Sequence, residues 1–348
     1  MKVRLGRGLV KAFVCLMAIL ALCLCAVLAV RVWEEKENRA QKAAEAGDEA
    51  DKKEEDLVYY ENAWYTPKKS LETVLILGID KYVEDSSQSV HGTFEQADFI
   101  MLLILDRKVG ASVGIHLNRD TMTEISVLNN VGAVAETKIG QLTLSHTYGG
   151  TAEIRCKNTV DAVSNLLYGM KIDHYLSLTM DSVAVLNDLA GGITLEVLDD
   201  FKGIDDTLVK GETVTLRGSQ ALTYVRTRKD LEDSSNLRRM KRQRQYLEAL
   251  QTCVFEKMDT DDTFMLSALS RVNPYLVSDC SVEQLSDLAE AIKECGQREY
   301  LTLEGEAKKG KNYVEFYVNE DALQKMVMDV FYERDADYEV QSIGDYGH

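Results

Sequence analysis

From residue 71 onward, short apolar runs alternate with turns and amphipathic stretches, a pattern typical of an α/β domain. Apolar runs at 73–80, 98–106 and 111–117 predict buried strands, and the short link between the last two predicts an antiparallel hairpin. Further strands are predicted at 171–180, 193–197 and 221–228, helices at 151–169, 181–192, 237–256, 261–270, 281–294 and 320–332, and a late hairpin at 300–307 with 313–318. Helices mixed among neighbouring strands predict a three-layer α/β/α sandwich on a mixed central sheet.

One long apolar run lies ahead of this domain. Residues 12–30 carry no charge and are long enough to span a bilayer as a helix. A cleaved signal peptide would have a shorter run and small residues before the cut, and a lipid anchor is less favoured because Leu precedes Cys23 and Cys25. Four basic residues within 1–11 predict a cytoplasmic N-terminus. We therefore expect one transmembrane helix in the cell membrane, with the rest of the chain extracellular.

The remaining chain divides by composition. Residues 31–70 begin with a run rich in both charges, which predicts an extracellular stalk; 71–335 are expected to form one domain, and 336–348 a tail. Four cysteines fall in the predicted domain, namely Cys156, Cys253, Cys280 and Cys295. They show no C-x-x-C spacing, so thiolate metal binding is not expected, whereas one or two disulfides are open to them.

Charged residues gather where the first three predicted strands end or begin. Asp80 ends the first strand, Asp98 begins the second, and Arg119 with Asp120 follows the third. Antiparallel pairing would bring them to one rim of the sheet, where α/β proteins hold ligands. Each residue alone could be a surface charge, but the set together favours a site. Two carboxylates beside arginines further suggest Mg²⁺ (or Mn²⁺) bridging to a phosphate.

A second cluster is basic, although the chain as a whole has a net charge of −17. If 221–228 is a strand, Arg226 and Arg228 point to one face and suit a bidentate grip on phosphate. On the following helix, Arg239 and Gln243 are i, i+4 neighbours. Other cations of this helix are expected partly at its solvated side, namely Arg238, Lys241, Arg242 and Arg244. An extracellular domain excludes nucleic acid and favours a pyrophosphate or anionic polymer at the membrane.

These segments resemble, in order, the LytR–CpsA–Psr family of bacterial cell-envelope phosphotransferases. The matching stretches are LILGID, ADFIMLLILD, NRDT, LSHTYGG, KIDHYLSL, LNDLAGGITLEV, GSQALTYVRTRKD and RRMKRQRQYLEAL. The resemblance implies the family's fold and an activity in cell wall biogenesis. That activity is transfer of an anionic glycopolymer, of teichoic acid or capsule type, from an undecaprenyl pyrophosphate carrier to peptidoglycan.

The resemblance also implies roles for individual residues. It assigns Asp80 and Asp98 to the metal and the pyrophosphate, and it assigns phosphate binding to Arg119, Arg226, Arg228, Arg239 and Gln243. Asp98, Arg119 and Asp120 are the expected catalytic residues, with Asp120 in an orienting or basic role. Neutralising the developing phosphate charge would be the main catalytic effect.

Two positions depart from the family pattern. Gln96 stands where the family usually has a phosphate-binding arginine, and Asn118 replaces a proline. Losing one charge-assisted contact costs about 1.5–3 kcal/mol. A catalytically weakened polyprenyl-phosphate-binding or regulatory relative is therefore one alternative, and a polyprenyl pyrophosphate hydrolase is another. The family's older label of transcriptional attenuator has no counterpart here in a DNA-binding motif.

Overall fold

The computed structural model describes residues 57–80, 95–228, 231, 235–295 and 297–335. They belong to two compact units, one of residues 1–67 with 333–348 and one of residues 68–332. The predicted transmembrane segment, 12–30, lies outside the described residues. No helix among those described is both long and apolar enough to cross a membrane.

The smaller unit contains strands β1 (Val58–Tyr60) and β2 (Ala63–Pro67), which form a hairpin. Strand β15 (Tyr332–Arg334) joins them as the third strand of this sheet. The rings of Tyr59 and Trp64 lie 5.0 Å apart across the hairpin. The part of the predicted stalk that the structure describes is therefore largely strand, because its aromatic residues pair across a turn.

The larger unit contains a six-stranded sheet in the order β11-β8-β3-β4-β5-β12. Its strands are β3 (Leu71–Ile79), β4 (Ala97–Asp106), β5 (Ala111–Leu117), β8 (His174–Thr179), β11 (Leu276–Ser278) and β12 (Gln297–Thr302). Three pairs, β3–β4, β4–β5 and β8–β11, are antiparallel. Two pairs, β3–β8 and β5–β12, are parallel. The predicted mixed sheet and its β4–β5 hairpin are confirmed.

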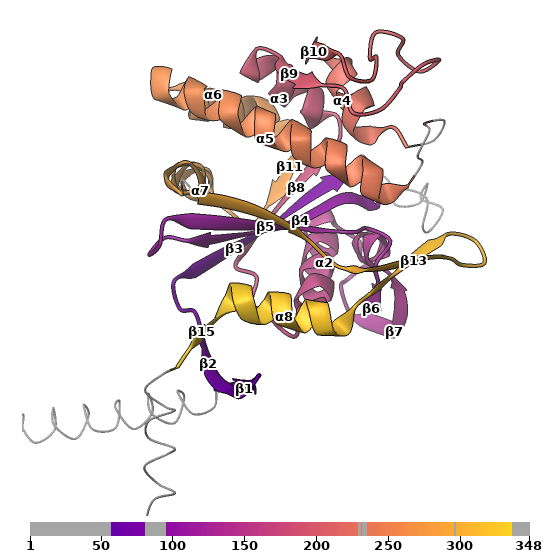
Figure 1. The fold of residues 1–348 in the computed structure, drawn as a ribbon, viewed down its shortest axis with the longest axis vertical. Coiled ribbons are helices and arrows are strands. Elements are labelled where there is room, and N and C mark those ends of the chain that lie inside the picture. The colour runs from indigo at the N-terminus through magenta and orange to yellow at the C-terminus, as the bar shows by residue number, and fades with distance from the viewer. Residues whose placement is uncertain (1–56, 81–94, 229–230, 232–234, 296, 336–348) are drawn as a thin grey trace, which may run out of the picture. The chain divides into compact units, whose positions relative to one another are not determined.

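Helices cover both faces of this sheet (Figure 1). On one face, α2 (Ala152–Leu166) and α8 (Glu320–Phe331) share a core with the inward side chains of β3, β4 and β5. On the other face, α7 (Val282–Glu294) packs against Val74, Leu103 and Leu105. The helices α3 (Ser182–Ala190) and α5 (Asn236–Thr260) lie on that same side. Sheet residues such as Leu102 are fully buried because helices cover both faces of the sheet.

A second core lies beyond that face. It joins α3 and α5 to α4 (Ser219–Arg226) and to the two-stranded sheet of β9 (Ile193–Glu196) and β10 (Thr213–Leu216). The helix α6 (Phe264–Val272) packs on α5 through a smaller cluster, and the 3-10 turn η3 (Asn273–Tyr275) leads from it into β11. This second core packs α4 against the middle of α5, through Tyr246 and Leu250.

One predicted strand is wrong, because residues 221–228 fall mostly in helix α4. Ala221, Tyr224 and Val225 are its buried positions, and their i, i+3, i+4 spacing belongs to a helix. Gly218 precedes the helix with a φ of +50°. Arg226 and Arg228 therefore do not project from one face of a strand, although both residues still reach the site described below.

Two hairpins also differ from expectation. The late hairpin is formed by β13 (Gly305–Lys309) and β14 (Val314–Val318), because β12, just before it, joins the central sheet instead. A hairpin of β6 (Met122–Leu128) and β7 (Val134–Gln141), followed by the 3-10 helix η2 (Leu142–Thr147), was not predicted. Most of β7 is exposed, so its residues lack the alternation that marks a half-buried strand.

Of the cysteines considered for disulfides, Cys156, Cys253 and Cys280 have free thiols. Because only Cys295 is then left, these four residues form no disulfide among themselves. Burial raises the pKa of the Cys156 thiol to about 12, so this residue is an inert part of the core between α2 and the sheet.

Candidate active site

The predicted rim exists at the edge where β3 and β5 end and β4 begins. Ile79 pairs with Ala97, and Ile100 pairs with Leu117, so the residues just beyond these pairs come together. Arg119 forms an ion pair with Asp98, and its Nε lies 3.6 Å from Asp120 Oδ1. Arg119 thus contacts both of the other predicted catalytic residues at the rim.

Helix α5 brings a second guanidinium to the rim. Ser235 caps the helix by accepting a hydrogen bond from the Arg238 N–H, and this places Arg239 in the first turn, pointing at β4. Arg239 Nη1 lies 3.9 Å from Asp98 Oδ2, and Nη2 donates to Asn236 Oδ1 at 2.6 Å. Asp98 therefore stands between Arg239, which is buried, and Arg119, whose side chain is 14% exposed.

Burial and the repulsion between neighbouring positive charges lower the pKa values of Arg119 and Arg239. Burial, followed by the nearby charge of Arg239, lowers the pKa of Arg119 to about 10. Burial and the charge of Arg228 lower the pKa of Arg239 likewise to about 10. Both groups still carry a charge at neutral pH, and Arg239 Nε has no hydrogen-bond partner among the described residues. A cluster of crowded cations with unused donors is suited to an anion.

Arg226 and Arg228 complete the cluster, by a route other than the one predicted. Arg226 is the last residue of α4, and its Nη2 lies 2.9 Å from Asp80 Oδ1 at the end of β3. Arg228 follows the helix, close enough to depress the pKa of Arg119 and Arg239. All the arginines expected to bind phosphate therefore converge on the rim.

Gln243 lies one helical turn after Arg239, as expected. Its Nε2 donates to the main-chain oxygen of Val225 at 3.4 Å, which joins α5 to α4. Its Oε1 is buried with no hydrogen-bond partner among the described residues. Gln243 lies at the boundary between the cation cluster and the apolar groove described below.

Gln96, the residue that replaces a family arginine, has a defined contact. Its Oε1 accepts a hydrogen bond from Arg119 Nη2. The position is therefore filled by a neutral acceptor that orients Arg119. The cluster therefore has one positive charge fewer than the family pattern. One N–H group of Arg119 donates to Gln96 and is not available to a ligand in this arrangement.

Asn118, the other departure from the family pattern, links Asp120 to the start of α5 by hydrogen bonds. Its Oδ1 accepts hydrogen bonds from the Asp120 N–H at 3.0 Å and from Asn236 Nδ2 at 2.7 Å. Asp120 in turn accepts a hydrogen bond from Gln141 Nε2 at 3.0 Å. Burial raises the pKa of the Asp120 carboxyl, although neighbouring Arg119 opposes this shift. Asp120 is consequently a more basic carboxylate than an exposed aspartate.

Arg242 does not belong to the solvated side of α5, where it was expected. Its side chain is fully buried, forms an ion pair with Asp199, and donates from Nε to the main-chain oxygen of Tyr224 at 2.9 Å. A further hydrogen bond goes to the main-chain oxygen of Thr227. Arg242 therefore holds the end of α4, and with it Arg226 and Arg228, against α5. Arg238 supports the same anchor, since its Nε lies 2.5 Å from Asp199 Oδ1.

A buried network not found from the sequence supports the start of β4. Arg155 Nη2 lies 2.9 Å from Glu95 Oε1, and His146 Nδ1 lies 2.7 Å from the main-chain oxygen of Glu95. Glu95 has a φ of +64°, a conformation that L-residues seldom adopt. The network fixes Glu95 immediately before Gln96, across sequence separations of 51 and 60 residues that no local pattern reveals.

An apolar groove begins beside Gln243 and runs between the sheet and helices α3 and α5. Its walls include Ile76, Phe99, Val183, Leu186 and Leu247. Val225 and Gln243 also line it, so the groove opens next to the cation cluster. A cluster of cations adjoining an apolar groove suits an amphiphile with an anionic head.

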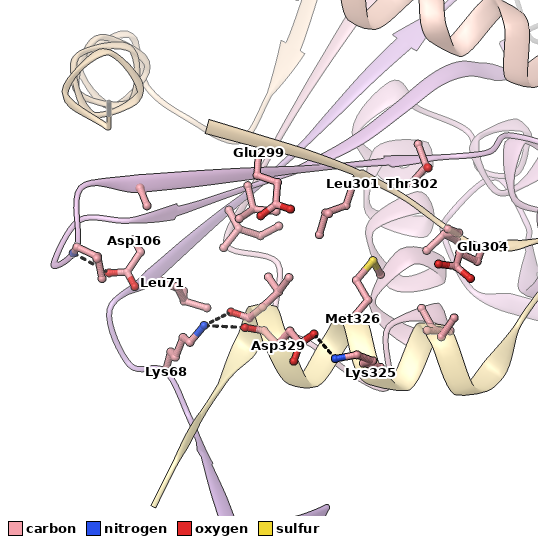
Figure 2. A pocket seen from close by; sticks show the side chains of 18 residues that line it. Lys68, Leu71, Asp106, Glu299, Leu301, Thr302, Glu304, Lys325, Met326 and Asp329 are labelled. Atoms are coloured by element: carbon pink, nitrogen blue, oxygen red, sulfur yellow. Dashed lines mark hydrogen bonds and ion pairs between the residues drawn. The ribbon is translucent and has the colours of Figure 1, made fainter. Parts of the chain in front are cut away.

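A larger cavity, of about 590 Å³, lies at the other end of the sheet, between β5, β12 and α8 (Figure 2). Lys68 Nζ donates there to the main-chain oxygens of Asp329 and Val330, at 3.0 and 2.8 Å. Its other charged side chains are Asp106, Glu299, Glu304, Lys325 and Asp329. Carboxylates outnumber lysines in this lining, so the cavity is poorly suited to a phosphate.

The fold is that of an α/β protein with a cluster of arginines at its strand ends. The chain matches the LytR_cpsA_psr family over residues 31–330 and belongs to that family. It is 30% identical over 183 residues to the polyisoprenyl-teichoic acid–peptidoglycan teichoic acid transferase TagU of Bacillus subtilis, covering 53% of this chain and 52% of TagU. It is 27% identical over 192 residues to the cell wall biosynthesis protein LcpA of Corynebacterium glutamicum, covering 51% and 36%. The chain thus spans about half the length, or less, of these relatives.

The fold has counterparts among solved structures. The structure described as TagT bound to LI-WTA superposes with a TM-score of 0.56 at 22% identity, over 75% of this chain and 90% of that one. At this level of identity the likeness concerns the fold alone. It agrees with the mixed central sheet described above.

Proposed function

We propose that this protein is a membrane-anchored, extracytoplasmic phosphotransferase. It moves an anionic glycopolymer of teichoic acid or capsule type from an undecaprenyl pyrophosphate carrier to peptidoglycan. One observation carries the proposal: a buried Arg239 and a largely buried Arg119 meet at the rim, with Arg226 and Arg228 beside them and an apolar groove adjoining. The name of TagU supports the reaction class. The membrane anchor rests on the uncharged segment 12–30.

The arginines would hold the pyrophosphate, while the groove takes the first apolar part of its lipid. In the reaction, a sugar hydroxyl of the wall forms a bond to the polymer's phosphorus, and the phosphorus–oxygen bond to the polyprenyl phosphate breaks. The four guanidiniums neutralise charge on the transferring group and on the leaving phosphate. Because its pKa is raised, Asp120 is the carboxylate better suited to take the hydroxyl proton.

Asp80 and Asp98 would hold Mg²⁺ or Mn²⁺. Carboxylate oxygens beside a phosphate are the donors that Mg²⁺ takes, commonly one or two together with substrate oxygens. Each carboxylate contacts an arginine, Asp80 with Arg226 and Asp98 with Arg119. These donors fit the ion, which would add positive charge against the pyrophosphate.

The test is reconstitution with the full-length chain in detergent, Mg²⁺, a lipid-pyrophosphate-linked glycopolymer and soluble peptidoglycan oligomers. Mass spectrometry should find the polymer joined to the oligomer through a phosphodiester, together with polyprenyl monophosphate. Release of polymer without an oligomer adduct would contradict transfer and establish a hydrolase. Donor binding with no product would contradict transfer and would favour a relative that only binds the donor. This is the second candidate function, because Gln96 supplies no positive charge where the family usually has an arginine.

A further inference from the structure

A cluster of three metal-binding residue types lies apart from the rim. His174 begins β8, and Asp279 and Cys280 follow β11. Their ligand atoms all lie within 4.8 Å of one another. The other end of β8, at Thr179, pairs with Ile79 next to the rim. Five residues of strand place the cluster about 17 Å from that end.

The sheet itself creates this arrangement. In the antiparallel pairing of β8 with β11, Ser278 lies opposite Leu176. Continuing the register by two residues sets Asp279 opposite Tyr175 and Cys280 opposite His174. The Tyr175 N–H donates to Asp279 Oδ1 at 3.0 Å, and the Cys280 N–H donates to Ser278 Oγ at 3.0 Å. Main-chain groups thus orient the carboxylate and fix the backbone of the cysteine before any ligand arrives.

The spacing of the donor atoms corresponds to a tetrahedral ion. His174 Nδ1 lies 3.7 Å and Cys280 Sγ lies 3.8 Å from the same oxygen, Asp279 Oδ1. Zinc bond lengths to nitrogen, oxygen and sulfur give separations of about 3.4 and 3.6 Å for these pairs in a tetrahedron. A contraction of a few tenths of an ångström would bring these two pairs to the separations of a tetrahedral site, and the third pair lies within 4.8 Å.

One polar atom of the cluster lacks a hydrogen-bond partner in the part of the chain that the structure describes. His174 Nδ1 is shielded from solvent and has no hydrogen-bond partner among the described residues. A buried ring nitrogen without a partner costs free energy, which a metal bond would relieve. The Cys280 thiol is free, so it is available as a ligand.

We propose that His174, Asp279 and Cys280 form a site for Zn²⁺ that joins β8, the end of β11 and the start of α7. A mixed nitrogen, oxygen and sulfur set favours zinc over Mg²⁺ or Ca²⁺, which take oxygen ligands. Three protein ligands leave a fourth position for water. This ion is distinct in chemistry and place from the hard cation proposed for the rim.

The experiment uses the full-length chain, freed of metal with a chelator and titrated with Zn²⁺ and Co²⁺. We expect one Zn²⁺ per chain with micromolar or tighter affinity, and a thiolate-to-cobalt absorption band in the ultraviolet. Cys280→Ser should abolish the band and weaken zinc binding at least about tenfold, as removing a metal contact does. His174→Gln should also weaken binding.

Cys253→Ser is the matched control, because Cys253 is another free thiol of intermediate exposure on α5, outside the cluster. It should leave the cobalt band and the zinc affinity unchanged. Absence of zinc binding by the wild-type chain overturns the proposal. So does binding that survives Cys280→Ser, since the ion would then be held elsewhere. Circular dichroism confirms that each variant is folded, and the wild-type cobalt spectrum tests the thiolate without any substitution.

Discussion

At the scale of single residues, Arg239 shows how function and stability oppose each other. Its guanidinium is buried, and burial together with the charges of Arg228 and Arg242 lowers its pKa to about 10. The folded state therefore holds this charge less favourably than the unfolded chain does at neutral pH. Such a residue is explained by a ligand that compensates its charge.

We expect Arg239→Met to separate these effects. Methionine lacks the guanidinium that would bind the phosphate, so affinity for a polyprenyl pyrophosphate should fall at least tenfold. The loss of one charged hydrogen bond corresponds to about 1.5–3 kcal/mol of binding free energy. The melting temperature without ligand should stay the same or rise, because a crowded buried cation is gone. Calorimetry and thermal unfolding measure the two quantities. Arg271→Met, at an exposed arginine of α6, should change neither.

Gln96 gives the second prediction at this scale. Gln96→Arg restores the cation of the family pattern, so donor affinity and transfer rate should rise several-fold. The melting temperature should fall, because Arg119 loses its acceptor and gains a like charge. Gln96→Lys serves as a comparison, with the charge but without the planar fork. If Gln96→Arg instead lowers donor affinity, the glutamine is adapted to this donor and the deficit in charge is not the relevant feature.

At the scale of elements, the sequence predicted the rim because it depends on strand order and hairpin pairing. Asp80, Asp98 and Arg119 follow directly from where apolar runs begin and end. The sequence did not distinguish Arg242 from its neighbours, because burial of an arginine requires a partner, Asp199, that lies 43 residues away. Residues 221–228 were assigned the wrong element for a similar reason. Their apolar run is too short to separate helix from strand by its spacing alone, and the second core against which it packs comes from distant segments of the chain.

Arg242 should therefore matter for the stability of α4 and α5. Arg242→Met leaves Asp199 with Arg238 alone and removes donors from two carbonyls, so the free energy of unfolding should fall by about 3 kcal/mol. Urea denaturation measures the loss. Lys241→Met, the exposed neighbour, should stay within about 0.5 kcal/mol of the parent. Equal effects of the two substitutions would contradict the anchoring role of Arg242.

At the scale of the whole molecule, two buried histidines predict how stability depends on pH. Burial lowers the pKa of His116 to about 3 and that of His146 to about 4. Below an unfolded value of 6.5, the unfolded chain binds protons that the folded chain does not, so stability decreases as pH falls. Each histidine contributes up to about 1.4 kcal/mol per pH unit in this range.

The free energy of unfolding should thus be lower at pH 5 than at pH 7 by an amount that His116→Gln roughly halves. Urea denaturation at the two pH values measures both. Equal stability of the wild-type chain at pH 5 and pH 7 would show that these rings are already accessible to protons. The comparison is confined to pH 5 to 7, because ordinary aspartates and glutamates, with pKa values of about 3.9 and 4.3, titrate mainly below this range.

The central claim is that the arginines from separate elements form one pyrophosphate site on this fold. The most direct measurement is the affinity of the full-length chain for a polyprenyl pyrophosphate, compared with a variant carrying both Arg226→Ala and Arg228→Ala. Arg226 ends α4 and Arg228 lies two residues further on, and these two are the more accessible arginines of the cluster. We predict that the double variant loses detectable binding, while Arg271→Ala retains it. Unchanged affinity in the double variant would contradict the assignment of the site.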